Sequence, residues 1–202
     1  MGTLQVGGTT LATKNVSTGK VDLSANYRPP AGGVIEQFMS PCDGSSITVQ
    51  SGTYTVQNVT GEWSIGSTSF TTVTGSAITY TPPAGTARVI YEFSFQHAYD
   101  DDSRPIISLK YSIGGTEVTN ARKSLDANSL EGFATFKWTH NIGGSTTAST
   151  GRVASWTSGL ELKLEAKEHS SDYEGRFHVT HHWDGGGTDQ FSQPVIGITA
   201  LG

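Results

Sequence analysis

Residues 88–96 read RVIYEFSFQ, and this stretch decides the fold class of the chain. Val89, Tyr91, Phe93 and Phe95 are large and apolar, whereas the residues between them are polar apart from Ile90. An antiparallel strand with one buried face and one solvent-exposed face requires this period of two. The sequence therefore predicts a half-buried β-strand here.

The same alternation recurs along most of the chain after residue 33. It predicts strands at residues 34–39, 47–49, 54–56, 76–81, 105–113, 132–140, 160–167, 177–183 and 191–201. Glycine-containing turns separate several of them, and residues 118–130 predict at most a short turn of helix. With about nine or ten strands, the chain is predicted to be all-β. The expected architecture is an antiparallel two-sheet, jelly-roll-like sandwich.

Composition agrees with this class and excludes several others. Of the 202 residues, 35% are hydrophobic and 15% are charged, and the 25 glycines keep no period of three. A coiled coil would carry more Glu, Lys, Ala and Leu. A disordered chain would carry more charge and fewer aromatic residues, and collagen needs glycine at every third position.

Charge and hydropathy also restrict the partners. The net charge is −5 and the 13 basic residues are scattered, which argues against nucleic acid as a partner. No apolar run approaches the ~20 residues that cross a bilayer as a helix, so no membrane partner is expected. Cys42 is the only cysteine and forms no internal disulfide.

Residues 1–30 differ from the rest of the chain and are predicted to form an extended N-terminal arm. RPPAGG at residues 28–33 separates the arm from the β-sandwich body at residues 31–202. The arm has too few large apolar residues to bury a core of its own. It is either a floppy terminus or a segment that the body, a sister subunit or another protein holds. We favour a partner, with Leu4, Val6 and Leu11 as contact residues.

Two groups of residues are candidate metal ligands. His178, His182 and Asp184 share one face of a predicted strand, and the carboxylates of the 100–102 loop could bind calcium. A zinc site needs three or four ligands, and calcium needs six to eight oxygens. We interpret the histidines as surface or subunit-interface residues and the acidic loop as solvated. The sequence predicts no metal and no cofactor.

Catalytic signatures are missing from the sequence. It contains no nucleophile elbow, no dinucleotide-binding glycine motif and no phosphate loop. A pair of carboxylates for glycoside cleavage could come from Glu92, Glu117, Glu131, Glu161 or Glu165, but any β-protein offers such pairs. Cys42 is expected to be a buried or inert thiol. We predict a protein that is not an enzyme.

The tryptophans fall into two groups. Trp138 and Trp183 lie on apolar strand faces and are expected in the core or at an interface. Trp63 and Trp156 have polar neighbours and are candidate exposed contact residues, with interface packing as an equal alternative. Exposed tryptophans could stack on sugars.

Three stretches resemble segments of virion structural proteins of marine and freshwater tailed phages, especially cyanophages. They are residues 33–45 (GVIEQFMSPCDGS), residues 78–93 and the opening LQVGGTTL at residues 4–11. The last is similar to N-terminal attachment segments of phage fibres. The resemblance covers about a quarter of the chain, and it implies a small jelly-roll body, often trimeric, that an N-terminal arm tethers to the particle. The resemblance assigns no functional role to any residue of this chain.

These observations leave three hypotheses for function. The first is a non-enzymatic virion surface protein of the capsid-decoration or head-fibre type, a homotrimer that binds other virion proteins through residues 1–30. The second is a tail-fibre module that recognises host surface polysaccharide through exposed aromatics. The third is a glycan-cleaving enzyme on a jelly-roll scaffold. We favour the first, because a core-poor arm before a Pro/Gly hinge suits a docking strand.

Overall fold

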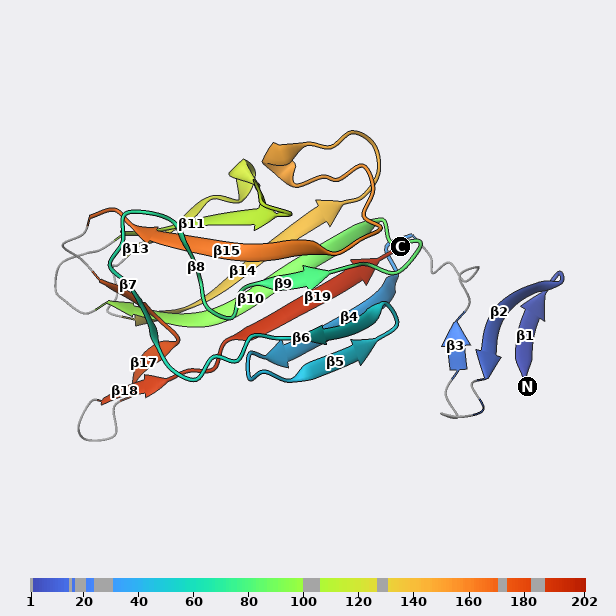
Figure 1. Cartoon of the computed structure of the whole chain (residues 1–202), viewed down its shortest axis with the longest axis horizontal. Helices are drawn as coiled ribbons and strands as arrows, with labels where there is room; N and C mark the ends of the chain where they lie inside the picture. The colour runs from blue at the N-terminus through green and yellow to red at the C-terminus, as the bar shows by residue number, and fades with distance from the viewer. Residues whose placement is uncertain are drawn as a thin grey trace.

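The chain is described by a computed structural model over residues 2–14, 16, 21–23, 31–99, 106–126, 131–170, 174–182 and 188–202. Nearly all regular structure in these residues is β-strand, in two facing sheets plus smaller pieces (Figure 1). The helical structure described is limited to two single turns, η1 (Thr119–Ala121) and η2 (Ala148–Thr150). The predicted all-β class is confirmed.

The first sheet is built around the long strand β10 (Arg88–Tyr99). β10 pairs along its whole length with β14 (Glu131–Asn141), and on its other edge with β19 (Val195–Leu201). β4 (Val34–Pro41) pairs with β19. Beyond the first residue of β19, two short strands continue the sheet on the same edge of β10. β16 (Gly175–Phe177) pairs with β10, and β7 (Trp63–Ile65) pairs with β16.

The second sheet has two central strands, β11 (Ile106–Ile113) and β15 (Leu160–Glu168), paired antiparallel. Two short strands share the free edge of β11: β12 (Thr116–Glu117) and β13 (Lys123–Asp126). Two others share the free edge of β15: β8 (Thr71–Thr72) and β9 (Ile78–Tyr80). The strand β13 falls in the 118–130 segment where no strand was predicted. The helical turn expected there is η1.

The strand order is that of a jelly roll. The principal strands along the chain are β4, β9, β10, β11, β13, β14, β15 and β19. Numbered 1 to 8 in that order, they give one sheet 1-8-3-6 and the other 2-7-4-5. Two interlocked Greek keys produce this arrangement. The predicted jelly-roll-like sandwich is therefore confirmed.

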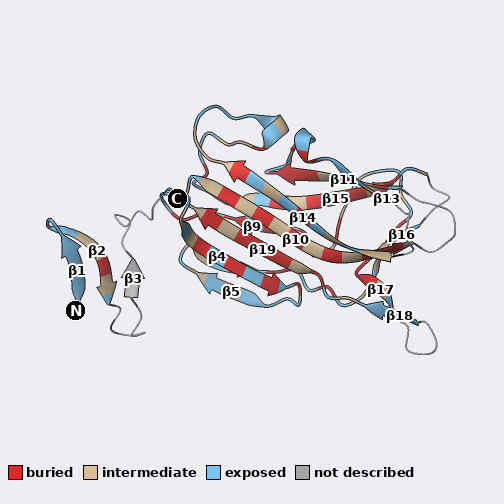
Figure 2. Cartoon of the chain, turned by 180° about the vertical axis from the view of Figure 1, so that it is seen from behind, coloured by how far each residue is buried: buried red, intermediate tan, exposed pale blue. Residues whose placement is uncertain are grey.

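The core lies between the two sheets, and the alternating residues supply it. Val89, Tyr91, Phe93 and Phe95 are at most 1% exposed, and Tyr91 packs on Tyr111 of the opposite sheet with ring centroids 5.0 Å apart. Figure 2 shows buried residues alternating with partly buried ones along β10. Every residue of the core cluster lies between Phe38 and Ile198. The body thus buries a core to which no described residue of the arm contributes.

A buried carboxylate fixes the hairpin of β5 (Ser46–Val49) and β6 (Gly52–Thr55) onto the sandwich. Glu36 on β4 accepts hydrogen bonds from Tyr80 Oη (2.7 Å), Ser51 Oγ (2.6 Å) and the Ser51 backbone N–H (2.8 Å). Tyr54 Oη donates to the Thr81 carbonyl oxygen at 2.9 Å. Hydrogen bonds of this kind offset the free-energy cost of burying a carboxylate. This network joins β4, the hairpin and β9.

The remaining strands form two small units. β17 (Val179–His182) and β18 (Thr188–Phe191) form a hairpin at one end of the sandwich (Figure 1). In the arm, β1 (Thr3–Val6), β2 (Thr9–Lys14) and β3 (Val21–Leu23) form a three-stranded antiparallel sheet. Among the described strands, those of the arm pair with one another and with no strand of the body.

Candidate functional site

The arm is a β-meander rather than a single extended strand. β1 and β2 are joined by Gly7 and Gly8, which both have positive φ (57° and 81°). A two-residue turn of this kind matches the twist of the flanking strands, and glycine adopts it without strain. Gln5 Nε2 donates to Thr10 Oγ1 at 3.0 Å, and the Lys14 N–H donates to the Gly2 carbonyl oxygen at 2.8 Å.

Two large apolar side chains of the arm face solvent. Leu4 and Val6, two residues apart on β1, are 61% and 64% exposed. Leu11 is half-buried and lies at a bulge, because Leu4 pairs with Ala12 and Gln5 pairs with Thr10. The structure thus brings Leu4 and Val6 onto one strand face and places Leu11 beside them on β2. An isolated sheet of this size needs a covered apolar face to be stable.

The arm enters the body at the end of the sandwich that holds the C-terminus. The Gly32 N–H donates to the carbonyl oxygen of Gly202 at 2.6 Å, and the Gly202 N–H donates to that of Gly33 at 2.9 Å. The φ of Gly32 is +82°, and an added Cβ would lie 3.1 Å from Arg88 Nη2. Glycine is therefore required where the chain turns into β4.

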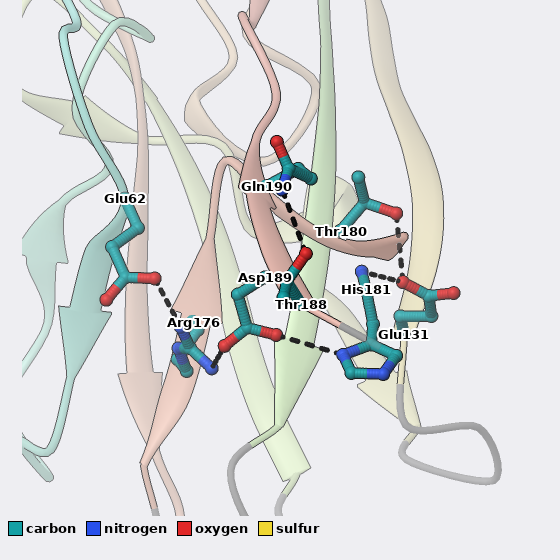
Figure 3. A network of polar contacts seen from close by, with 8 residues as sticks. All are labelled: Glu62, Glu131, Arg176, Thr180, His181, Thr188, Asp189 and Gln190. Atoms are coloured by element: carbon teal, nitrogen blue, oxygen red, sulfur yellow. Dashed lines mark hydrogen bonds and ion pairs between the residues drawn. The ribbon is translucent and has the colours of Figure 1, made fainter. Parts of the chain in front are cut away.

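The opposite end of the sandwich carries a network of charged side chains (Figure 3). Arg176 on β16 forms ion pairs with Glu62 and with Asp189 of β18, the latter at 2.7 Å. His181 Nδ1 lies 3.2 Å from Asp189 Oδ1. The hydrogen bonds from Arg176 and His181 hold the pKa of Asp189 below its ordinary value. Arg176 thus ties the β17–β18 hairpin to the segment before β7.

Glu131 ties the same hairpin to β14. Its Oε2 accepts hydrogen bonds from the His181 backbone N–H (2.5 Å) and from Thr180 Oγ1 (2.9 Å). These two donors lower the pKa of Glu131. The carboxylates in this network are engaged with neighbouring groups of the same chain, so the network fixes the hairpin in place.

The tryptophan expectations were wrong for Trp156. It is only 5% exposed, its Nε1 donates to the Tyr80 carbonyl oxygen at 3.0 Å, and its ring meets His140 edge-on with centroids 5.7 Å apart. The segment between β14 and β15 folds back over the end of the core and inserts this side chain, which its polar neighbours do not reveal. The indole is a core residue and offers no exposed stacking surface.

Trp63 is half-buried rather than exposed. It lies on β7, and its ring packs against that of Phe177 with centroids 5.2 Å apart. Trp138, expected in the core or at an interface, packs partly buried against the core cluster and donates its Nε1 hydrogen to the Thr150 carbonyl oxygen at 3.1 Å. Trp183 lies outside the described residues. The described tryptophans are thus used mainly for packing.

The predicted shared face of His178 and His182 is wrong. His178 has a φ of +64°, which turns the chain between β16 and β17 and interrupts the alternation. Its side chain is fully buried, with Nε2 at 3.0 Å from the Thr74 carbonyl oxygen, whereas His182 is exposed. Asp184 and the 100–102 loop lie outside the described residues. Within the described part of the chain, no three His, Cys, Asp or Glu residues gather as metal ligands do.

The glutamates considered for glycoside cleavage have separate partners. Glu92 pairs with Lys137, Glu117 with Arg122, Glu161 with Lys163 and Glu165 with Lys110. Glu131 belongs to the hairpin network described above. Each carboxylate is thus held by a group of its own neighbourhood, which is the arrangement of structural surface charges.

Cys42 is a buried thiol, as expected. It is fully buried, and its Sγ donates to the Gly75 carbonyl oxygen at 3.3 Å. Burial, reinforced by the charge of Asp43, raises the pKa of Cys42 to about 12. A thiol with so high a pKa is not an activated nucleophile at neutral pH.

Comparison with known proteins places the chain in no family. No protein-family description matches it, and no curated protein is significantly similar to it. Among the described residues, no helix has the length and apolar character needed to cross a membrane.

Proposed function

We propose that this chain is a non-enzymatic surface protein of a phage virion, of the capsid-decoration or head-fibre type, anchored to the particle by residues 1–30. One observation carries the proposal. The body buries its own core, whereas the arm forms a separate small sheet that leaves Leu4 and Val6 more than half exposed. A protein that needs no arm to fold retains one for contact with something else.

The geometry of the arm suits a larger assembly as its partner. In the described strands, β1 and β3 are the edges of the arm sheet, and strand addition uses the backbone N–H and C=O groups of an edge strand for affinity. Leu4 and Val6 add an apolar contact on the same strand. The Gly32–Gly202 contact places the arm's attachment point at one end of the jelly roll, which leaves the other end free to project.

We also propose that the body is a homotrimer on the particle. The outer face of the first sheet exposes Met39 (59%) on β4 and Phe133 (66%) on β14. Both side chains point away from the core on the same sheet, and we take this face as the contact between subunits. Closed rings of identical subunits are the usual form of such assemblies.

The alternative, a tail-fibre module that binds host polysaccharide through Trp63 and Trp156, loses support. Trp156 is inside the core and Trp63 is half-buried against Phe177. A proposal of glycan binding therefore needs a different surface of the body.

Electron microscopy of intact particles tests the proposed function. An antibody raised against the body, residues 31–202, should bind the outer surface of the particle in regular positions on the head. Labelling at the tail tip would contradict the decoration role and support the tail-fibre role. Particles that carry none of this protein would contradict the virion proposal altogether.

A further inference from the structure

A cationic groove lies on the outer face of the second sheet, far from the arm in the sequence. Its volume is about 500 Å³, and its lining includes Phe70, Ser108, Arg122, Lys123, Ser124 and Lys167. Small-molecule sites usually have volumes of about 300–1,000 Å³. The groove therefore has the size of a ligand site.

The strand register explains how these side chains meet. Ser108 on β11 is paired with Ser124 on β13 and with Lys167 on β15, so these three residues form one row across the sheet. Leu109 alternates with them and points into the core. Arg122 precedes β13 by one residue and lies two residues from Ser124. Two hydroxyls thus lie between cationic groups on either side.

The ring of Phe70 contacts two ammonium groups at this groove, that of Lys167 and that of Lys110 beside it. Lys110 Nζ lies 4.7 Å and Lys167 Nζ lies 5.2 Å from the centre of its ring. Cation–π contacts of this kind restrict the ammonium groups without neutralising them. Lys110 and Lys167 are on neighbouring strands, so the ring fixes the spacing of their charges.

The groove is more positive than the protein as a whole. Lys110 is paired with Glu165 at 3.4 Å and Arg122 with Glu117 at 2.5 Å. Lys167 forms no ion pair with a carboxylate of the described residues. Lys123 is paired in register with the buried Leu109, so its side chain leaves the sheet on the other face. The whole chain carries a net charge of −5. An uncompensated ammonium group with a second cationic side chain, Arg122, in the same groove of an acidic protein indicates an anionic ligand.

We propose that this groove binds acidic carbohydrate, through the carboxylate of a uronic acid or the sulfate of a sulfated sugar. Arg122 and Lys167 would hold the anionic group, and Ser108 and Ser124 can both donate to and accept from sugar hydroxyls. A nucleic acid backbone fits less well, because the rest of this acidic surface repels a long polyanion. The inference concerns the body alone and does not depend on the arm or on the virion role.

Isothermal titration calorimetry on the full chain tests this site with three probes: an oligogalacturonate, a heparin-derived oligosaccharide and neutral maltohexaose. At least one acidic probe should bind, with an affinity that falls as salt is added, and the neutral probe should not. Binding of only one acidic probe identifies whether carboxylate or sulfate is recognised. Absence of binding by both, or equal binding of maltohexaose, would overturn the proposal.

Charge-matched variants assign the binding to this groove. The double substitution R122Q/K167Q should weaken binding by about tenfold or more, the usual cost of losing hydrogen bonds to a charged group. The control K14Q/K137Q removes the same charge at Lys14 on β2 and Lys137 on β14, and should leave the affinity unchanged. An equal loss in both double variants would show that only the overall charge matters and would overturn the assigned site.

Discussion

His140 and Tyr111 are joined in the core by a hydrogen bond of 2.9 Å between Nε2 and Oη. The other ring nitrogen, Nδ1, lies 2.9 Å from the Gly151 carbonyl oxygen, which can only accept. Nδ1 therefore carries the proton, and Nε2 accepts from the tyrosine hydroxyl. Both ring nitrogens are satisfied by the neutral imidazole, and burial lowers the pKa of His140 to about 4. Burial gives His178 the same pKa of about 4.

These two histidines predict that the fold loses stability in acid. Their pKa in the unfolded chain is near 6.5, so the unfolded state takes up protons first as the pH falls. We expect the free energy of unfolding to fall between pH 6.5 and pH 4, by about 3 kcal/mol per histidine at most. Urea denaturation across this range measures the effect. H178N keeps a residue that tolerates positive φ and should reduce the pH slope; an unchanged slope would contradict the assignment.

We expect Glu168 to change the pH dependence of the free energy of unfolding in the opposite direction. This carboxylate is fully buried at the end of β15, and burial raises its pKa to about 7, although the backbone N–H of Gly175 opposes the shift. Because the pKa is higher in the folded state, its contribution is lost as the pH rises from 4.5 to 7. E168Q should raise the free energy of unfolding at pH 8 by about 1–3 kcal/mol and by less at pH 4.5.

The matched control for Glu168 is the exposed Glu174. E174Q removes the same charge without relieving burial, and should leave the free energy of unfolding unchanged within ~0.5 kcal/mol. A stabilisation of E168Q that is the same at pH 4.5 and pH 8 would argue against titration of Glu168. The acid series on the histidines is best repeated in the E168Q background, where the opposing effect is removed.

The long strands could be predicted from sequence because they repeat a local rule. Residues 88–96, 105–113, 132–140 and 160–167 alternate with few exceptions, and each coincides with most of a strand in the structure. The jelly-roll class followed from the number of such segments. The pairing order of the strands needs contacts between segments far apart in sequence, which one chain does not reveal.

The predictions that failed did so for physical reasons that no local sequence pattern reveals. The predicted strand at 177–183 breaks at His178, because a positive φ there turns the chain and three successive residues become buried. Trp156 has polar neighbours, yet the long β14–β15 connection places it under Tyr80. The cationic groove was missed for a similar reason. Its residues come from β11, β13 and β15 and from the segments just before β8 and β13, and no local pattern brings them together.

If the protein is a trimer, we expect its molar mass in solution to depend on the apolar residues of the outer face of the first sheet. Size-exclusion chromatography with light scattering should give the mass of three chains for the full protein. M39S/F133S should shift it toward one chain, because both substitutions remove exposed apolar contacts from that face. I106S, which changes an exposed apolar residue on the second sheet, should remain trimeric. A monomeric full-length protein at micromolar concentration would contradict the trimer.

The arm is predicted to bind through the exposed face of β1. L4S/V6S removes its two large apolar side chains, which are 61% and 64% exposed, and should reduce the amount of protein on particles several-fold. The melting temperature should not change, because neither residue belongs to the core cluster. The control T3S/Q5N alters the neighbouring residues of the same strand and should attach normally. Equal attachment of both variants would exclude this face as the contact.

Deletion of residues 1–30 tests the anchoring claim most directly. The body, residues 31–202, should fold with its core intact, since every core-cluster residue lies between Phe38 and Ile198. Particles that lack this protein are incubated with the full chain or with the body alone and purified by density gradient. The amount of bound protein is then measured by mass spectrometry. We predict that the full chain is recovered on the particles and the body is not. Recovery of the body at the level of the full chain would contradict the account.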